Sequence, residues 1–323
     1  MKDKDRNPFF SIIIPVFNTA DYLDRCLLSV INDNNKTPYE IIIVDDGSTD
    51  DSAEKCDYYR KQDHHISVIH KTNGGQSSAR NLGIKQARGQ YVYFLDSDDF
   101  LFAGCLERIY EYLSIQTGCD ILQVSVSIKR ERKKVDFLYK PFNTEMPYNG
   151  HEFLKKSLHS SFCTAPWGYF FRRAFLCDNN LFFHEGIFHE DEEFTPLALL
   201  VANEVLTFDC NVYCYCIRKG STTTQKNKTK NANDLLIVCS ILEPVFLNVT
   251  DNELRALLLD RLVSICFSAF FVGYKTDKQF GKKIDSKVLD YSYSLKNKLK
   301  TCLFKLNPGL FFTVLNLIHI VKR

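Results

Sequence analysis

Apolar and polar positions follow two alternating periods through the first hundred residues. Continuous apolar runs at 10–17, 40–44, 66–69 and 91–95 predict four buried strands. Between the first two, apolar residues recur at helical spacing, namely Leu23, Cys26, Leu27, Val30 and Ile31. The order strand–helix–strand–helix–strand predicts an α/β fold with a mostly parallel sheet and helices on both faces.

The pattern changes character toward the end of the chain. Further helices are expected at 102–115 and 194–202, and further strands at 120–128 and 212–217. Long helical patterns then fill 233–248 and 252–275, with Thr250 and Glu253 as a capping box for the second. Lys- and Ser-rich linkers are expected around 276–300, before an apolar helix at 310–321. We therefore divide the chain into an α/β domain, 1–230, and a helical region, 231–323.

Composition excludes several classes. A net charge of +2 over 323 residues argues against a nucleic-acid partner. The 12 cysteines lack the paired spacing of a zinc site, and Cys210, Cys214 and Cys216 fall in a strand-like run, so we expect free thiols in a reducing cytosol. The charged N-terminus lacks a signal-peptide core, and we expect no window of about 20 apolar residues that could span a membrane.

The candidate chemistry is concentrated where strands end. The run YVYFL at 91–95 is followed by Asp96, Ser97, Asp98 and Asp99. Three carboxylates at the end of a buried strand repel one another unless they are solvated or share a cation. The Asp-x-Asp spacing offers oxygen ligands to a hard ion, Mn²⁺ or Mg²⁺, although a solvated loop also explains it. Asp99 is expected to cap the following helix.

A second acidic pair, Asp45 and Asp46, ends the strand at 40–44 and precedes a turn rich in helix-capping residues. In mostly parallel sheets, ligands bind outside the carboxyl ends of the strands. Both acidic pairs are therefore expected at the same edge of the sheet, where a ligand would bind.

Several segments together resemble one family. SIIIPVFNTADYLDRCLLSV, EIIIVDDGSTDDS and NGGQSSARNLGIKQARGQYVYFLDSDD, followed by APWGYFFRR, HEDEEF and YCYCIRKGS, closely resemble the family 2 glycosyltransferases of the GT-A fold. The resemblance covers about residues 10–221, in the family's order, and leaves the C-terminal hundred residues unmatched.

The resemblance implies a site for a UDP-sugar. It assigns the nucleoside pocket to Pro15, Phe17 and Asn18, the base and ribose contacts to Asp45 and Asp46, and a further pocket contact to Arg80. Within the Asp96-Ser97-Asp98 motif, Asp98 would ligate the metal and Asp96 would contact ribose or metal-bound water. Arg218, Lys219 and Ser221 match a basic loop over the diphosphate, although Cys216 stands where the family often has arginine. Helix capping is the alternative role for Asp45 and Asp46, and a surface ion pair is the alternative for Arg80.

On the acceptor side, Trp167 matches a tryptophan that stacks on sugar, with core packing as the alternative. His189 lies in the matching HEDEEF segment and is assigned to the acceptor site. Asp191 matches the catalytic base, and Glu190 is the second candidate.

The function implied is inverting, metal-dependent transfer from a UDP-sugar to a glycan, with a lipid-linked acceptor, in cell-surface polysaccharide synthesis. The expected location is the cytoplasm, with contact to the inner membrane face through the helix at 310–321 and its flanking lysines. One alternative is a sugar-1-phosphate nucleotidyltransferase, which would want a Gly-rich basic loop in place of Pro15-Val16-Phe17-Asn18. The other is a non-catalytic sugar-nucleotide-binding scaffold.

Overall fold

The computed structural model describes residues 7–32, 37–116, 118–130, 135–142, 146–217 and 229–321. They form two compact units. The sheet unit contains, among the described residues, 7–153, 163–186 and 194–217. The helical unit contains 154–162, 187–193 and the described residues from 229 onward.

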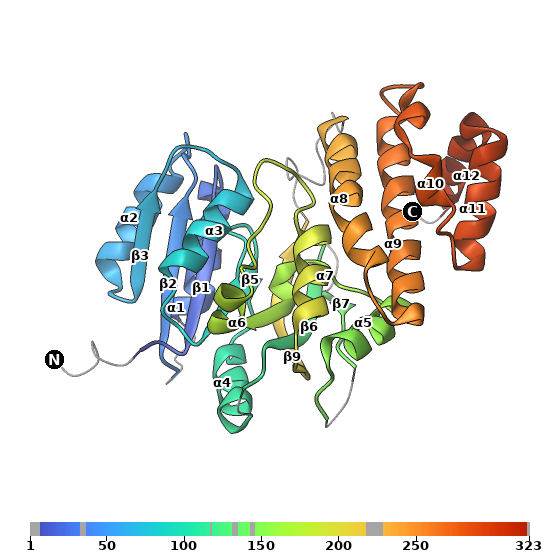
Figure 1. Ribbon diagram of the computed structural model, residues 1–323. Helices are drawn as coiled ribbons and strands as arrows, with labels where there is room; N and C mark the ends of the chain where they lie inside the picture. Colours follow the sequence, from blue (N-terminus) through green and yellow to red (C-terminus); the bar gives the residue numbers. More distant parts are fainter. Residues whose placement is uncertain are drawn as a thin grey trace. The chain divides into compact units, whose positions relative to one another are not determined.

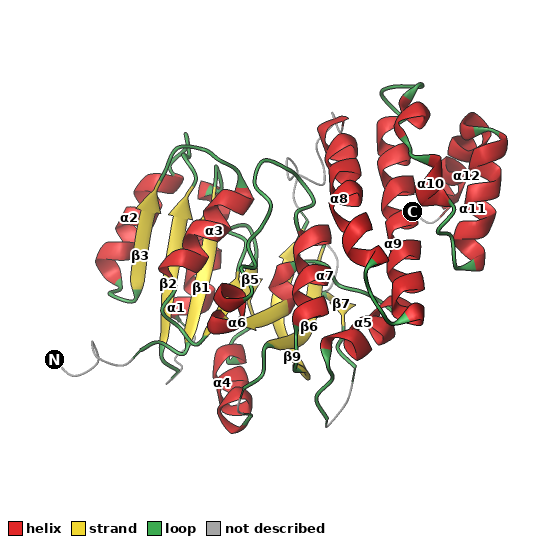
Figure 2. Cartoon of the chain, in the orientation of Figure 1, coloured by secondary structure: helices red, strands yellow, loops and turns green. Residues whose placement is uncertain are grey.

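The first half of the sheet is parallel, as predicted. Its strands are β1 (Phe10–Val16), β2 (Tyr39–Asp45), β3 (Ile66–His70) and β4 (Tyr91–Phe94), in the spatial order β3-β2-β1-β4. Ile12 pairs with Ile41 and with Tyr93, and all three side chains are buried. These continuous apolar strands are buried because helices cover the sheet (Figure 1, Figure 2).

The second half of the sheet mixes directions. It comprises β5 (Phe100–Leu101), β6 (Ile121–Lys129), β7 (Asp136–Tyr139), β8 (Tyr169–Arg172) and β9 (Val205–Cys216). The order continues β4-β8-β6-β9-β5, with β7 beside β6. β8 is antiparallel to β4 and β6, whereas β9 is parallel to β6. β9 begins well before the expected residue 212, because Asn211 and Asp209 break its apolar run but accept hydrogen bonds from serines of β6.

Seven α-helices begin in the described part of the sheet unit or cross into it. They are α1 (Ala20–Ile31), α2 (Ser52–Gln62), α3 (Gln76–Gln86), α4 (Cys105–Ile115), α5 (Gly150–His159), α6 (Arg173–Asp178) and α7 (Asp191–Val201). A short 3₁₀ turn, η1 (Pro166–Gly168), precedes β8. Glycine at position 83 lets α3 approach β1 closely. A Cβ atom there would be only 2.4 Å from Cγ2 of Ile13.

The helical unit contains α8 (Thr229–Leu247), α9 (Asn252–Gly273), η2 (Phe280–Lys283), α10 (Ser286–Leu289), α11 (Leu295–Leu306) and α12 (Pro308–Val321). Two expectations were wrong. The region 276–300 is not only linker, since it contains α10 and the start of α11. The cap of α9 is Asp251, whose carboxylate accepts from the Leu254 amide at 2.9 Å, and not Thr250.

α9 corrects a further expectation. By length and composition it is apolar enough to cross a membrane, although 56% of its most apolar 18-residue window is buried within the protein. Asp260 and Arg261 interrupt its apolar sequence. Asp260 accepts from the Tyr293 amide at 2.8 Å, and Arg261 pairs with Glu192 at 2.6 Å. A helix that is mostly buried and whose charged residues have partners is typical of a protein core. Such a helix can be as long and as apolar as a membrane span.

All 12 cysteines are free thiols, which confirms that part of the prediction. Cys210, Cys214 and Cys216 are buried in β9. Cys239 of α8 and Cys266 of α9 are also buried, with sulfur atoms 3.2 Å apart.

Candidate functional site

The carboxyl ends of β1 to β4 meet at one edge of the sheet, because the four strands are parallel. Hydrogen bonds join the segments that leave this edge. The Asp46 amide donates to the Val16 carbonyl at 2.8 Å, and the Thr19 hydroxyl donates to Ser97 at 2.8 Å. The sheet therefore brings the loops after β1, β2 and β4 into contact.

Asp45 ends β2 in a buried, well-bonded position. Its carboxylate accepts from the Ser48 amide at 3.0 Å and lies 2.8 Å from Nδ1 of His70, at the end of β3. Burial raises the pKa of Asp45, but the hydrogen bonds from His70 and Ser48 outweigh this effect and the pKa is lowered. The same hydrogen bond raises the pKa of His70. Asp45 is thus held as a carboxylate in a fixed orientation.

Asp46 organises the neighbouring turn. One oxygen accepts from Lys71 at 2.6 Å and from the Gly74 amide at 2.9 Å, and the other accepts from the Gly75 amide at 2.7 Å. Gly75 has φ +89°, a conformation that glycine adopts without strain. Sequence analysis did not predict this role. The expected contact with base or ribose stays a prediction for both aspartates.

The segment after β1 is shaped by its side chains. Pro15 lies in β1 beyond the last residue paired with β4, where a missing amide costs no ladder bond on that side. Asn18 has φ +51°, and its side-chain oxygen accepts from the Thr49 amide at 2.8 Å. Phe17 is 46% exposed beside it. An exposed aromatic ring next to fixed backbone is compatible with the nucleoside pocket predicted here.

Arg80 lies on α3 and reaches the acidic motif from the interior. Its Nη2 atom is 2.7 Å from Oδ1 of Asp96, and only 2% of the residue is exposed. Its guanidinium also lies over the Phe183 ring, 5.2 Å from the centroid. Gln76 donates to the same Asp96 oxygen at 2.9 Å. Arg80 and Asp96 were both predicted, whereas Gln76 was missed because a glutamine at a helix start carries no distinctive signal.

Asp98 and Asp99 occupy different environments. Asp98 is partly exposed, and Arg25 donates to its backbone carbonyl. Asp99 is buried, with its carboxylate accepting from the Tyr213 hydroxyl and from the Cys216 amide at 2.7 Å. Burial, and then the charges of Asp98 and Asp96, raise the pKa of Asp99. The expected capping role was wrong, because α4 begins at Cys105, after Gly104, and Asp99 bonds to β9 instead.

The residues of the motif fit a divalent cation. Arg80 and Gln76 both donate to Oδ1 of Asp96, which holds that oxygen in place. Asp98 lies two positions along, in the turn after β4, and is accessible to solvent. Two carboxylates are a common protein contribution to a Mg²⁺ or Mn²⁺ site that phosphate oxygens complete.

Trp167 lies in η1 and is 8% exposed. Its ring stacks on Tyr213 of β9, with centroids 4.9 Å apart and an 11° angle between planes. Its carbonyl accepts from Tyr93 at 2.7 Å. These contacts favour the packing alternative for most of the ring. Stacking on a sugar stays a prediction that depends on its small exposed part.

The segment with the proposed base opens α7 and belongs to the helical unit. His189 has φ +64°, Glu190 is buried and Asp191 is partly exposed at the first helical position. Glu192 binds Arg261 of α9 through both carboxylate oxygens, at 2.7 and 2.6 Å. Glu192 is therefore engaged in an ion pair with α9. The roles of His189, Glu190 and Asp191 stay predictions.

The basic loop predicted to cover the diphosphate cannot be placed. Its residues Arg218, Lys219 and Ser221 lie outside the described residues.

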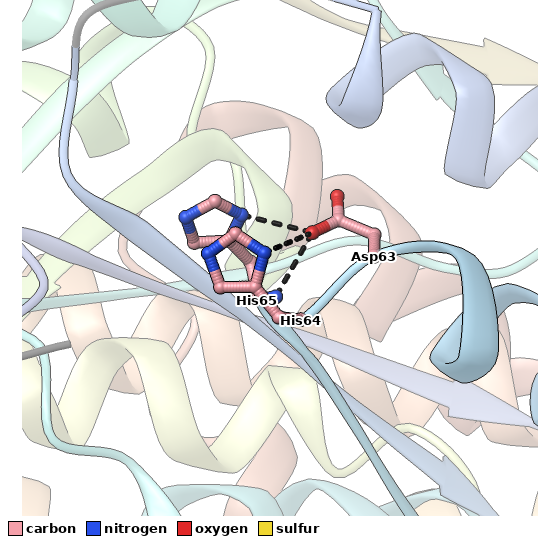
Figure 3. Close-up of side chains that lie close together, drawn as sticks. All are labelled: Asp63, His64 and His65. Atoms are coloured by element: carbon pink, nitrogen blue, oxygen red, sulfur yellow. Dashed lines mark hydrogen bonds and ion pairs between the residues drawn. The ribbon is translucent and has the colours of Figure 1, made fainter. Parts of the chain in front are cut away.

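Two other features lie at the opposite edge of the sheet, so neither belongs to this site. Asp63, His64 and His65 precede β3, and both imidazole rings turn one nitrogen toward Oδ1 of Asp63 (Figure 3). The His65 amide also donates to that oxygen, at 2.9 Å, so a local turn accounts for the cluster. A cavity of about 460 Å³ lies at the amino ends of β1 and β4, lined by residues that include Phe9, Arg88 and Arg172.

Comparison with known proteins places the chain in a class. Residues 11–177 match the model of glycosyl transferase family 2. The chain is 36% identical over 228 residues to the uncharacterized glycosyltransferase EpsJ of Bacillus subtilis, covering 67% of this chain and 63% of EpsJ. It is 28% identical over 213 residues to the poly(ribitol-phosphate) beta-N-acetylglucosaminyltransferase TarS of Staphylococcus aureus, covering 65% of this chain and 36% of TarS.

Solved structures agree in fold. A crystal structure of S. aureus TarS 1–349 with UDP-GlcNAc superposes with a TM-score of 0.66 at 22% identity, covering 87% of this chain and 83% of that one. The mannosyltransferase PcManGT from Pyrobaculum calidifontis, with GDP-Man and Mn²⁺, gives 0.56 at 12% identity, covering 94% and 88%.

The fold is thus the GT-A fold of glycosyltransferases. The chain belongs to glycosyl transferase family 2. It spans less than two thirds of the length of EpsJ and of TarS.

Proposed function

We propose that this protein is an inverting, metal-dependent glycosyltransferase that moves a sugar from a UDP-sugar to a glycan acceptor. The observation that carries the proposal is the meeting of Asp45, the Asp96–Asp98 motif and Arg80 at one edge of the sheet. Family membership supports the reaction class, and the TarS complex with UDP-GlcNAc supports a UDP-sugar donor.

In this proposal each group has a separate task. The fixed carboxylate of Asp45 accepts hydrogen bonds from the base or ribose. Arg80 and Gln76 hold Asp96 in one orientation, and Asp98 offers an accessible carboxylate beside it. A divalent cation held by Asp96 and Asp98 would supply charge neutralisation of the departing diphosphate. PcManGT, solved with Mn²⁺, supports Mn²⁺ as one candidate, and Mg²⁺ is the other.

The transfer itself is a single displacement. Asp191 takes the proton of the acceptor hydroxyl, whose oxygen bonds to C1 of the sugar as the bond from C1 to the diphosphate breaks. Glu190 is the second candidate for this role. The acceptor proposed is a lipid-linked saccharide of cell-surface polysaccharide synthesis, reached from the cytoplasm. The TarS name, which specifies transfer to a poly(ribitol-phosphate), supports a polymeric acceptor.

The test is release of UDP from a panel of UDP-sugars, with and without Mn²⁺ and with candidate acceptors. We expect release that depends on both metal and acceptor. A nucleotidyltransferase would instead consume a sugar 1-phosphate and release pyrophosphate. A non-catalytic binding scaffold would show nucleotide-sugar-dependent thermal stabilisation without UDP release. Either outcome would contradict the proposal.

A further inference from the structure

Helix α11 has its apolar and polar faces reversed. Its buried residues are Asn297, Thr301 and Phe304. Its outward residues include Leu295, Leu299 and Leu306, which are 73%, 64% and 83% exposed. With the exposed Cys302 they form the set 295, 299, 302 and 306, whose spacing of four, three and four places them on one face of a helix. We call this set the outer stripe.

Specific hydrogen bonds keep the polar face inward. The Asn297 side chain donates to the Asp260 carbonyl at 2.8 Å and to the Ser264 hydroxyl at 2.9 Å, both on α9. The Thr301 hydroxyl lies 2.7 Å from that of Ser292. Turning the helix to bury its leucines would break these bonds and leave buried polar groups unsatisfied. The exposure of the outer stripe is therefore built into the fold.

Lysines border the outer stripe. At 100° per residue, Lys296 and Lys298 fall on opposite sides of it, and both are exposed. α11 contains four lysines and no acidic residue, and the span 282–305 contains seven lysines and two aspartates. One of these aspartates, Asp290, pairs with Lys305. An apolar stripe between cations matches the interface of a bilayer that contains anionic lipid.

α12 packs beside α11 (Figure 1) and also exposes apolar residues. Its inner side is anchored by Phe311, which is fully buried with its ring 4.9 Å from that of Phe267. Its outer positions Leu310, Leu317 and Ile318 are 52%, 57% and 46% exposed. The helix is thus docked on α9 by one face and leaves a second apolar face uncovered.

We propose that the outer stripe of α11 docks on a membrane surface containing anionic lipid. The lysines favour this occupant over a second copy of the chain, because α11 contains four lysines and no acidic residue, so facing copies of α11 would bring like charges together. Membrane docking does not depend on the transfer reaction. It would bring the protein to the surface where a lipid-linked acceptor resides.

The experiment is flotation of the full chain with vesicles of phosphatidylcholine alone or with about one third phosphatidylglycerol, without nucleotide sugar. We expect binding to the anionic vesicles that weakens at high salt. The variant Leu295→Gln/Leu299→Gln/Leu306→Gln should lower the partition coefficient about tenfold or more. Lys296→Glu/Lys298→Glu should lower it on anionic vesicles by a similar factor of about ten or more.

The matched control is Leu28→Gln/Ile115→Gln/Met146→Gln, which changes three apolar residues exposed elsewhere. Unchanged melting temperatures show that each variant is folded. Equal binding by the outer-stripe variant and the control would overturn the proposal, as would absence of binding by the unaltered chain. A dimer in sedimentation that dissociates only in the outer-stripe variant would also overturn it, and would assign the stripe to self-association. Because no sugar is transferred, failure here leaves the glycosyltransferase proposal intact.

Discussion

The Tyr213 hydroxyl donates a hydrogen bond to the carboxylate of Asp99, next to the predicted metal motif. Tyr213 lies on β9 and also carries the stacked ring of Trp167. A single side chain therefore links the turn after β4 to the predicted acceptor-side tryptophan. β9 supports the turn a second time, through the Cys216 amide.

Removal of this hydroxyl tests the link. In Tyr213→Phe, Asp99 keeps its burial but loses a donor, so we expect the free energy of unfolding to fall by about 1–3 kcal/mol. Urea denaturation measures the change. Tyr58→Phe is the matched control, since Tyr58 is 58% exposed and its hydroxyl should contribute little. Equal losses in the two variants would contradict a stabilising contribution from the hydrogen bond between Tyr213 and Asp99.

The metal assignment is tested by Asp98→Asn, which preserves shape and removes one charge from a hard-cation site. We expect loss of metal-dependent UDP binding in calorimetric titrations and loss of transfer. Stability should be kept or slightly raised, because Asp98 is one of the charges that raise the pKa of buried Asp99. Glu107→Gln, at an exposed position of α4, is the control. Unchanged Mn²⁺ dependence of UDP binding in Asp98→Asn would reject the assignment.

The base is tested by Asp191→Asn. General-base catalysis contributes about 10²–10⁴-fold, so turnover should fall by that factor. The dissociation constant for the UDP-sugar should stay nearly constant, because the base touches the acceptor. Glu190→Gln should cost less.

Glu192→Gln is the matched control for the same segment. It weakens the pair with Arg261 and should lower stability while turnover is kept. If Glu190→Gln abolishes turnover while Asp191→Asn keeps it, Glu190 is the base. If both variants retain full transfer, the base lies outside this segment.

The pair of His70 and Asp45 makes a pH prediction. Hydrogen bonding to Asp45 raises the pKa of His70 above 6.5. The stabilisation from protonated His70 should therefore be complete below about pH 6.5 and vanish as the pH rises through the folded-state pKa. It should be small, because the His70 side chain is 42% exposed and the pair is screened.

NMR titration of the His70 ring checks the shift directly. Asp45→Asn should return the pKa of His70 toward its ordinary value. The control is Asp63→Asn, which changes an aspartate beside His64 and His65 and should leave the pKa of His70 unchanged. A His70 pKa at or below 6.5 in the unaltered protein would contradict the assigned hydrogen bond.

The sequence by itself determined the parallel half of the sheet and the acidic residues at its edge. Continuous apolar runs have few alternatives to burial, and parallel strands necessarily bring their carboxyl ends together, so Asp45 and Asp96 could be placed from pattern alone. The Arg80 position also came from a local motif. These features depend on neighbours close in the chain.

Only the tertiary structure decided which partners the polar groups take. Nothing in the sequence around Asp99 indicates that its carboxylate accepts a hydrogen bond from Tyr213, 114 residues away. Nothing around Asp46 indicates that its carboxylate accepts one from the Gly75 amide. Only the start of α11 fell within the region expected to be linker. The residues of the outer stripe have helical spacing in the sequence itself, but the sequence does not indicate that this face is the exposed one. The hydrogen bonds of Asn297 to α9 join residues far apart in the chain and leave no period in the sequence, so the outward orientation of the stripe became visible only in three dimensions.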